Sequence, residues 1–248
     1  MTDPLFQPIT LGSKEIKNRI WMSTMHLNMV INYEVGDQIC DFYAERARGG
    51  AGAICVGFVS VDRIGSMPPN IGGHDDKYIP GLTRLASAIK DNGSAAAAQI
   101  NHTGRQAFSM MLPKGEQAVA PSPVFCRMTG ETPRELTEDE IWDIIDKFAA
   151  TTGRLVKAGF DIIEVLMGTG YLISSFLSPL TNKREDDWGG SFENRTRFAI
   201  EVLKAVKKAA GPDVPVIPRM NGNDLMGEGL GSMPHVDFAK KLAEEGVH

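Results

Sequence analysis

The chain has 248 residues, and its 26 basic and 31 acidic side chains give a formal net charge of -5. The charges are interspersed, so no basic patch is available for nucleic acid or anionic lipid. No apolar run reaches membrane-spanning length, the N-terminus lacks a signal pattern, and the three cysteines form no CxxC pair. We therefore expect a cytoplasmic globular protein without a metal site.

The chain opens with LFQPITLGSKEIKNRI, which reads as a small hairpin whose turn contains Gly12 and Ser13. Beyond it, short unbroken apolar runs alternate with longer amphipathic stretches. Unbroken runs are typical of strands that are covered on both faces, as in a parallel sheet. The predicted strands cover residues 19–24, 52–60, 94–101, 160–167 and 214–220. The predicted helices cover residues 36–48, 79–91, 137–158, 191–210 and 234–245.

Start and stop signals support two of the predicted helices. Thr137 and Glu140 form a capping-box pattern before an apolar run, and Gly159 follows the end of the same helix. Gly211 and Pro212 end the next long helix. No internal repeat and no linker-like segment marks a domain boundary, so we expect a single α/β domain over residues 1–248.

The unbroken alternation of strands and helices implies right-handed crossovers, in either an open doubly wound sheet or a (β/α)8 TIM barrel. Two features favour the barrel. Polar residues collect at the carboxyl ends of several strands, where barrel enzymes build their sites. No glycine-rich nucleotide fingerprint follows the first strand, where residues 25–28 read MHLN. The opening hairpin could then plug the amino-terminal end of the barrel.

The number of strands is too small for a closed barrel. Only five strand–helix units can be placed, and the chain stops at residues 244–248, where a sixth strand would begin. A closed barrel of this kind needs eight strands, and a five-stranded arc leaves unpaired edges. The sequence therefore predicts an incomplete barrel, truncated before strand six. Either it is part of something longer, or a partner supplies the remainder.

Polar side chains at the strand ends are the candidate site residues. Gln99 and Asn101 lie two apart on one strand and share a face, and an amide suits the edge of a heteroaromatic ring such as a flavin pyrimidine. Arg219 could stabilise negative charge on a reduced cofactor, or could pair structurally with Glu164. Tyr171 could deliver a proton to a developing carbanion or enolate, or could simply pack. For Gln99 and Asn101 the alternative is a capped strand end with solvated polar groups.

Five segments run in a fixed order through nearly the entire chain: KNRIWMSTMH, FYAERARGGAGAICVG, QINHTGR, GYLISSFLSPLTNKREDDWGGSFENRTRF and VIPRM. This order resembles the Old Yellow Enzyme family of flavin-dependent barrels. The spacing of SPLTNKR, WGGS and ENRxRF is the most specific part. STMH, QINHTGR and GYLI look closest to the branch with 2,4-dienoyl-CoA reductase, 2-enoate reductase, bile-acid-modifying reductases and trimethylamine dehydrogenase.

The resemblance implies an FMN that lies across the carboxyl end of the barrel. The implied cofactor contacts are Ser23, Thr24, Met25, His26, Gly57, Gln99 and Arg219. In this arrangement Gly57 lets the ring approach the second strand, Gln99 binds the pyrimidine edge and Arg219 lies by N1 and O2. His26 stands where trimethylamine dehydrogenase has the cysteine that links covalently to FMN, which argues against such a linkage. The dienoyl-CoA reductase pattern also has histidine there.

Tyr171 falls on the family's active-site tyrosine, as a proton donor or substrate-orienting group. Hydride would pass from flavin N5 to the β-carbon of an activated alkene, and a proton would add beside the carbonyl. Many members grip that carbonyl with a His-x-x-His or His-x-x-Asn pair, but those positions here read Leu166 and Thr169. The dienoyl-CoA reductase pattern has glutamate at the place of Thr169. Thr169 and Tyr171 remain the expected substrate contacts.

These features predict an FMN-dependent NADH:flavin oxidoreductase, an ene-reductase whose small-molecule substrate is an unsaturated acyl-CoA or related carboxylate. The alternatives are an oxidative amine dehydrogenase of the trimethylamine type, and a non-catalytic barrel fragment or subunit that needs a partner. The resemblance leaves NADH versus NADPH and a homo-oligomer open.

The missing end of the barrel bears on cofactor binding. The family holds the FMN phosphate on loops after strands seven and eight, which lie outside these residues, so the 248 residues alone are not expected to hold FMN tightly. In the related branch the barrel continues into a 4Fe-4S segment and a domain for FAD and NAD(P)H. These groups are expected only in a longer parent protein.

Overall fold

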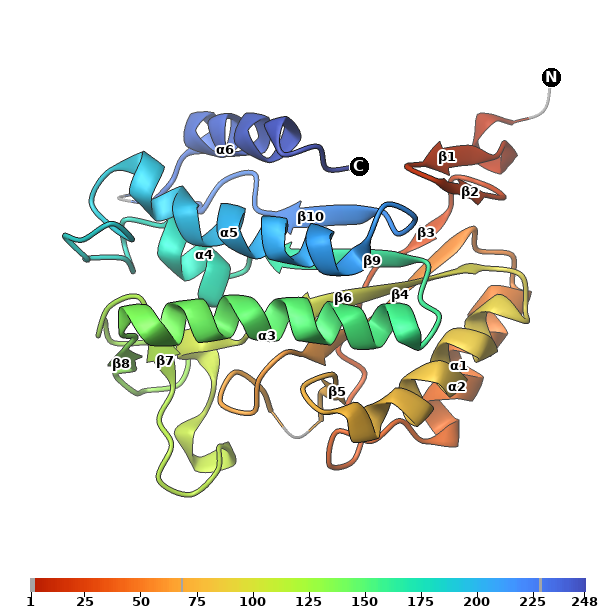
Figure 1. Ribbon diagram of the computed structural model, residues 1–248, viewed down its shortest axis with the longest axis horizontal. Coiled ribbons are helices and arrows are strands. Elements are labelled where there is room, and N and C mark those ends of the chain that lie inside the picture. The colour runs from red at the N-terminus through yellow and green to blue at the C-terminus, as the bar shows by residue number, and fades with distance from the viewer. Residues whose placement is uncertain (1–2, 68, 228) are drawn as a thin grey trace.

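The computed structural model describes residues 3–67, 69–227 and 229–248, which form a curved parallel sheet covered by helices (Figure 1). The strands lie in the order β10 (Val216–Met220), β9 (Ile162–Met167), β6 (Ala95–Asn101), β4 (Ala53–Ser60) and β3 (Trp21–Met22). All neighbouring pairs are parallel, and the short β5 (Ile71–Gly72) pairs with the end of β4. Each of these five strands therefore lies beside its predecessor in the chain, as in a (β/α) barrel. In the described residues β3 and β10 remain the two edges of an open arc.

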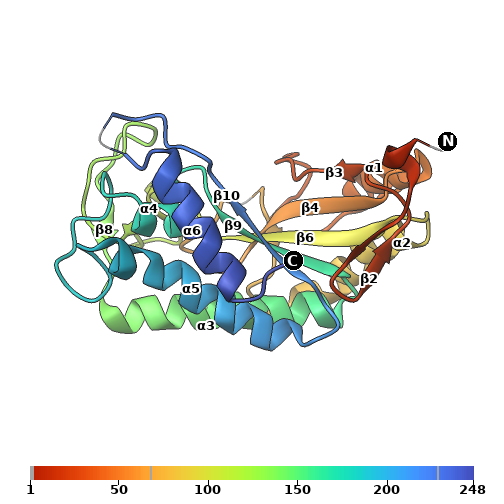
Figure 2. The same cartoon turned by 90° about the horizontal axis from the view of Figure 1, so that it is seen from above.

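The predicted helices are present with shifts of one or two residues at their ends. They are α1 (Asp37–Arg48), α2 (Ile79–Lys90), α3 (Glu138–Lys157), α5 (Phe192–Ala210) and α6 (Ser232–Glu244). The capping box of Thr137 and Glu140 is formed at the start of α3. Figures 1 and 2 show α3 and α5 side by side along one face of the sheet. Among the described residues, no helix has the length and apolar character needed to cross a membrane.

The unbroken apolar strands have two buried faces because the sheet has an outer and an inner core. Residues that alternate along the strands point to opposite faces. The outer core packs against the helices and includes Ile54, Val56, Ala96, Ala98 and Ile163. The inner cluster consists of Ile16, Ala53, Cys55, Ala97 and Ile162. Its side chains are mostly small, as the concave side of a curved sheet requires.

The N-terminal hairpin closes one end of this inner cluster. Its strands β1 (Ile9–Leu11) and β2 (Lys14–Ile16) are antiparallel, and the turn uses Gly12 at a φ of 56°. Ile9, Leu11 and Ile16 pack against the amino-terminal ends of the sheet strands. The hairpin thus lies at the end opposite the predicted polar residues.

Two features were not predicted from the sequence. A short helix, α4 (Leu172–Leu177), directly follows β9, and all six of its residues are buried. An excursion over residues 102–136 separates β6 from α3 and contains the paired β7 (Val119–Ala120) and β8 (Arg134–Glu135). The elements α4, β7 and β8 are each too short to give a periodic signal.

Arg184, in the segment SPLTNKRE, fastens the excursion to the chain after α4. Its side chain is only 7% exposed and forms ion pairs with Asp186 at 2.5 Å and Glu135 at 3.2 Å. Its Nη1 also donates to the carbonyl of Leu136 at 2.7 Å and to that of Pro121 at 3.2 Å. This buried guanidinium is therefore one of the anchors of the excursion.

We expect Arg184→Ala to lower the free energy of unfolding by about 3 kcal/mol, because two carboxylates and two buried carbonyls lose their donor. Arg48→Ala is the matched control, since Arg48 is exposed and its guanidinium donates to the Asn92 side chain at 3.3 Å, its one side-chain hydrogen bond within the described residues. Its loss should stay within about 0.5 kcal/mol. Chemical denaturation of both variants measures the difference, and equal losses would contradict the role given to Arg184.

Candidate functional site

The predicted site residues gather at the carboxyl edge of the sheet. Parallel pairing places the ends of all five strands at this edge. Arg219, at the end of β10, donates to the hydroxyl of Ser23 after β3 at 3.4 Å, so this contact joins the two edges of the open arc. Among the described residues Arg219 forms no ion pair with Glu164, and its side-chain contact is with Ser23.

A buried polar group lies just inside this edge. Gln99 is 3% exposed, and its Nε2 donates to Oε1 of Glu164, which is 5% exposed, at 2.5 Å. The Cys55 thiol approaches the same oxygen at 3.8 Å. Burial and the neighbouring Glu164 carboxylate raise the pKa of the Cys55 thiol well above its usual range, so the thiol stays a donor. Glu164 was not a predicted site residue, although a lone carboxylate in the apolar run FDIIEVLM was a visible signal.

Gly57, in β4, lies at the same level, as the register partner of Gln99. Its φ is 140°, and a Cβ at this position would lie 2.9 Å from the carbonyl oxygen of Gln99. The register between β4 and β6 shifts between Gly57 and Val59. Only glycine fits this backbone without strain. The position suits the close approach of a flat ring.

Aromatic side chains cluster at the carboxyl edge of the sheet, here called the mouth. The ring of Phe58 lies 5.0 Å from that of His26 and 5.4 Å from that of Tyr171. Burial raises the pKa of the Tyr171 phenol, so the hydroxyl stays protonated and able to donate near neutral pH. Burial also lowers the pKa of His26, against which Asn70 and the Pro69 carbonyl act in the opposite direction. Phe58 was missed because a single aromatic residue inside an apolar strand reads as core.

The remaining predicted residues lie on the rim of the mouth. Met25 is 45% exposed. Thr169 has a φ of 61°, and its N–H donates to Oδ1 of Asn221 at 3.0 Å. Asn101 Nδ2 is buried and has no hydrogen-bond partner among the described residues, whereas Thr24 lies beside the Cys55 thiol. An atom such as Asn101 Nδ2 is costly to leave unpaired, so it fits a polar heterocycle that would supply a partner.

His102 and Arg105, which continue the same polar run, serve the excursion instead. Arg105 donates to the carbonyls of Val124 at 2.9 Å and Phe125 at 2.5 Å. His102 is 1% exposed, and its Nδ1 accepts the N–H of Gly104 at 3.1 Å. Burial lowers the pKa of His102 to about 4. The polar run therefore divides into site residues on the strand and structural residues after it.

A cavity of about 650 Å³, here called the rim groove, adjoins Thr169 and lies between three loops. The excursion contributes Phe125 and Arg127, and the loop after β10 contributes Met226. Its lining also includes the hydroxyl-bearing residues Ser174, Ser175, Ser178 and Thr181. The groove thus has apolar edges and a polar interior. It lies next to the loop over residues 168–171, here called the tyrosine loop.

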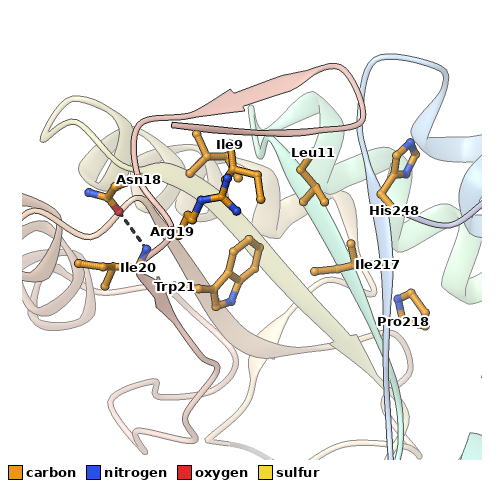
Figure 3. A pocket seen from close by; sticks show the side chains of 10 residues that line it. Ile9, Leu11, Asn18, Arg19, Ile20, Trp21, Ile217, Pro218 and His248 are labelled. Atoms are coloured by element: carbon orange, nitrogen blue, oxygen red, sulfur yellow. Dashed lines mark hydrogen bonds between the residues drawn. The ribbon is translucent and has the colours of Figure 1, made fainter. Parts of the chain in front are cut away.

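A second cavity, of about 420 Å³, lies at the other end of the sheet (Figure 3). The hairpin covers it, and Trp21 and Ile217 project into it from the two edge strands. Its lining is largely apolar and includes Ile9, Leu11 and His248. Because it lies away from the carboxyl ends of the strands, it is not the chemical site.

The fold and the residue pattern match known flavin enzymes. The model of the NADH:flavin oxidoreductase / NADH oxidase family matches residues 4–248. The metal reductase of Desulforamulus reducens is 46% identical over 98% of this chain and 36% of its own length. The NADPH dehydrogenase of Bacillus subtilis is 35% identical over 100% of this chain and 72% of its own. The chain thus spans little more than a third of the metal reductase.

Among solved structures, the complex of 2-naphthoyl-CoA reductase with 2-naphthoyl-CoA has a TM-score of 0.93 and 32% identity. It covers 100% of this chain and 40% of its own. The open arc of five parallel strands therefore has the course of the corresponding part of that larger protein.

The buried histidine gives a pH prediction. The folded-state pKa of His102, about 4, lies below its ordinary 6.5, so the unfolded chain binds a proton that the native state excludes. This term should remove about 2 kcal/mol of stability as the pH falls from 7 to 5.

His102→Asn, whose Oδ1 can accept the same Gly104 N–H, should lose correspondingly less stability over that range. Chemical denaturation at both pH values measures the two slopes. Identical slopes in the variant and the parent protein would show that His102 is not the titrating group.

Proposed function

Because the chain belongs to the NADH:flavin oxidoreductase / NADH oxidase family, we propose that it binds FMN across the carboxyl edge and reduces an activated carbon–carbon double bond. The observation that supports the proposal is that Gln99, Arg219 and Tyr171 all lie at the carboxyl ends of neighbouring parallel strands, with Gln99 as the register partner of Gly57. Such a reaction needs an amide to bind the flavin pyrimidine, a cation to stabilise negative charge and a protonated phenol to donate a proton. Both the flavin-dependent oxidoreductase activity and the alkene substrate are parts of this proposal.

Each group has a distinct role in the proposed reaction. Gln99 would bind the pyrimidine edge, and Arg219, which contacts Ser23 from the opposite edge strand, would stabilise the negative charge of the reduced ring. FMN held there would supply hydride chemistry, with NADH or NADPH as the reductant. Tyr171 donates the proton to the α-carbon, because its phenol stays protonated at neutral pH.

We propose a CoA thioester as the substrate class. At the two positions where many family members bind the substrate carbonyl, this chain has Leu166 and Thr169. Leu166 is apolar and 4% exposed, so it cannot donate to a carbonyl, whereas Thr169 is exposed. A thioester arm carries amides, a hydroxyl and apolar carbons, which complement the polar interior and apolar edges of the rim groove. The exposed Arg127 at the groove suits a phosphate. The naphthoyl-CoA ligand of the similar reductase supports this class.

The first test concerns the proton. In the full-length protein, Tyr171→Phe should slow reoxidation of the flavin by an enoyl thioester by about a hundredfold, since general acid catalysis contributes that order. Reduction by NADH or NADPH should change less than about twofold. Stopped-flow absorbance of the flavin separates the two half-reactions.

Tyr78→Phe, which removes a phenol from the buried residue before α2, is the control and should alter neither half-reaction. Equal slowing of both half-reactions in Tyr171→Phe would remove Tyr171 from the proton-donor role.

The second test concerns the thioester arm. Arg127→Ala should raise KM for a CoA thioester about five- to tenfold, as expected for one exposed phosphate contact. KM for the matching N-acetylcysteamine thioester, which lacks phosphates, should not change. Arg63→Ala, on the loop after β4, should leave both values unchanged. A parallel rise for the two thioesters would place Arg127 outside the CoA site.

A further inference from the structure

We propose that Glu164 is a positioning residue that fixes the orientation of the Gln99 amide and so decides which hydrogen-bonding groups meet the flavin pyrimidine. The inference rests on the proposed function, because it takes FMN as the ligand. It concerns the residue below the cofactor contact rather than the contact itself.

The geometry places Glu164 directly beside Gln99 and inside the arc. The two residues are register partners in the parallel pair of β6 and β9. Gln99 Nε2 donates to Glu164 Oε1 at 2.5 Å, and both side chains are at least 95% buried. Below them lies the inner cluster, with Cys55, Ala97 and Ile162. The amide and the carboxylate therefore form the layer between an apolar floor and the mouth.

Packing alone does not explain this carboxylate. A buried carboxylate without a cation is costly, and a hydrophobic side chain would suit the apolar layer better. In the part of the chain that the structure describes, no lysine, arginine or histidine forms an ion pair with Glu164. Its partners are two neutral donors, the Gln99 amide and the Cys55 thiol. A group held by donors alone acts as an acceptor.

An acceptor at this place fixes the amide. Because Nε2 of Gln99 donates to Oε1 of Glu164, the Oε1 and the second N–H of Gln99 remain for the ligand. The flavin pyrimidine presents an N3–H donor between two carbonyl oxygens. Oε1 can accept from N3–H while the neighbouring N–H donates to a carbonyl. If the Oε1 and Nε2 of Gln99 were exchanged, an N–H would face the N3–H and the Oε1 would face a carbonyl oxygen. Both hydrogen bonds would then be lost.

The test measures binding of two flavins to the full-length apoprotein by quenching of flavin fluorescence. One probe is FMN, and the other is 3-methyl-FMN, which lacks the N3–H donor. The wild-type protein should prefer FMN by about tenfold or more. With 3-methyl-FMN, the hydrogen bond between N3–H and Gln99 Oε1 is lost and Oε1 is left without a donor. Gln99→Ala should reduce this preference to about twofold or less.

Glu164→Met keeps the length of the side chain but lacks a strong acceptor. It should reduce the preference as far as Gln99→Ala does, and the double variant should show no further loss. Glu164→Gln keeps an acceptor oxygen and should retain more of the preference than Glu164→Met. Cys55→Ala removes the other donor to Glu164 but leaves the Gln99 pair, and should preserve the wild-type preference.

The outcomes separate the possible failures. A parallel fall in affinity for both flavins in Glu164→Met, with the preference intact, would show a merely structural role and overturn the inference. The inference is also overturned if the losses in the double variant multiply, or if Glu164→Gln is as poor as Glu164→Met. Failure of the wild-type protein to bind either flavin would instead overturn the proposed function.

Discussion

Parallel pairing of consecutive strands is the constraint on which the rest of the structure depends. Because every strand in the arc runs in the same direction, all five carboxyl ends meet at one edge and the four connections between them return across the outside as helices. Residues as distant in the chain as Ser23 and Arg219 thereby come within hydrogen-bonding distance. The same constraint places the hairpin and the apolar cavity at the other edge, away from the chemistry.

Curvature adds a second requirement, which concerns side-chain size. The concave face narrows towards the axis, and on β4 the small Ala53 and Cys55 face the inner cluster whereas Ile54 and Val56 face the outer core. On the inner face of β6 and β9, polar side chains begin at the layer of Gln99 and Glu164. This layering separates a dry floor from a polar mouth, and it makes hydrogen bonds at the mouth stronger than they would be in water.

The strands and helices could be predicted from the sequence because they are regular and long. The apolar runs and the cap at Thr137 gave their limits to within a few residues. The excursion over 102–136 and α4 could not be predicted, because their order comes from single anchors such as Arg184 rather than from a repeating pattern. The shortening of the first strand to Trp21–Met22 has a similar cause, since in the described residues it has one neighbour, β4.

In the candidate site, too, residues on regular strands could be predicted from the sequence, whereas residues in irregular segments could not. The strand positions of Gln99 and Asn101 indicated that both face the mouth, because alternation along a strand is geometric. The run continues into His102 and Arg105, and there the alternation ends, so sequence alone could not say that these two side chains turn into the excursion. Glu164 was visible as a carboxylate in an apolar strand, but its partner depends on the register of β6 and β9.

The absence of a carbonyl-gripping pair has a consequence for how a substrate would be held. With Leu166 buried and apolar, the mouth offers the reacting carbonyl few polar contacts, so orientation must come from parts of the substrate remote from the double bond. Remote binding energy can serve catalysis when it is used to position the reacting atoms. The rim groove lies beside the tyrosine loop and is of a size for such a remote group. On the proposed function, a small enone without a long arm would therefore bind poorly and react slowly, although the flavin and Tyr171 would be unchanged.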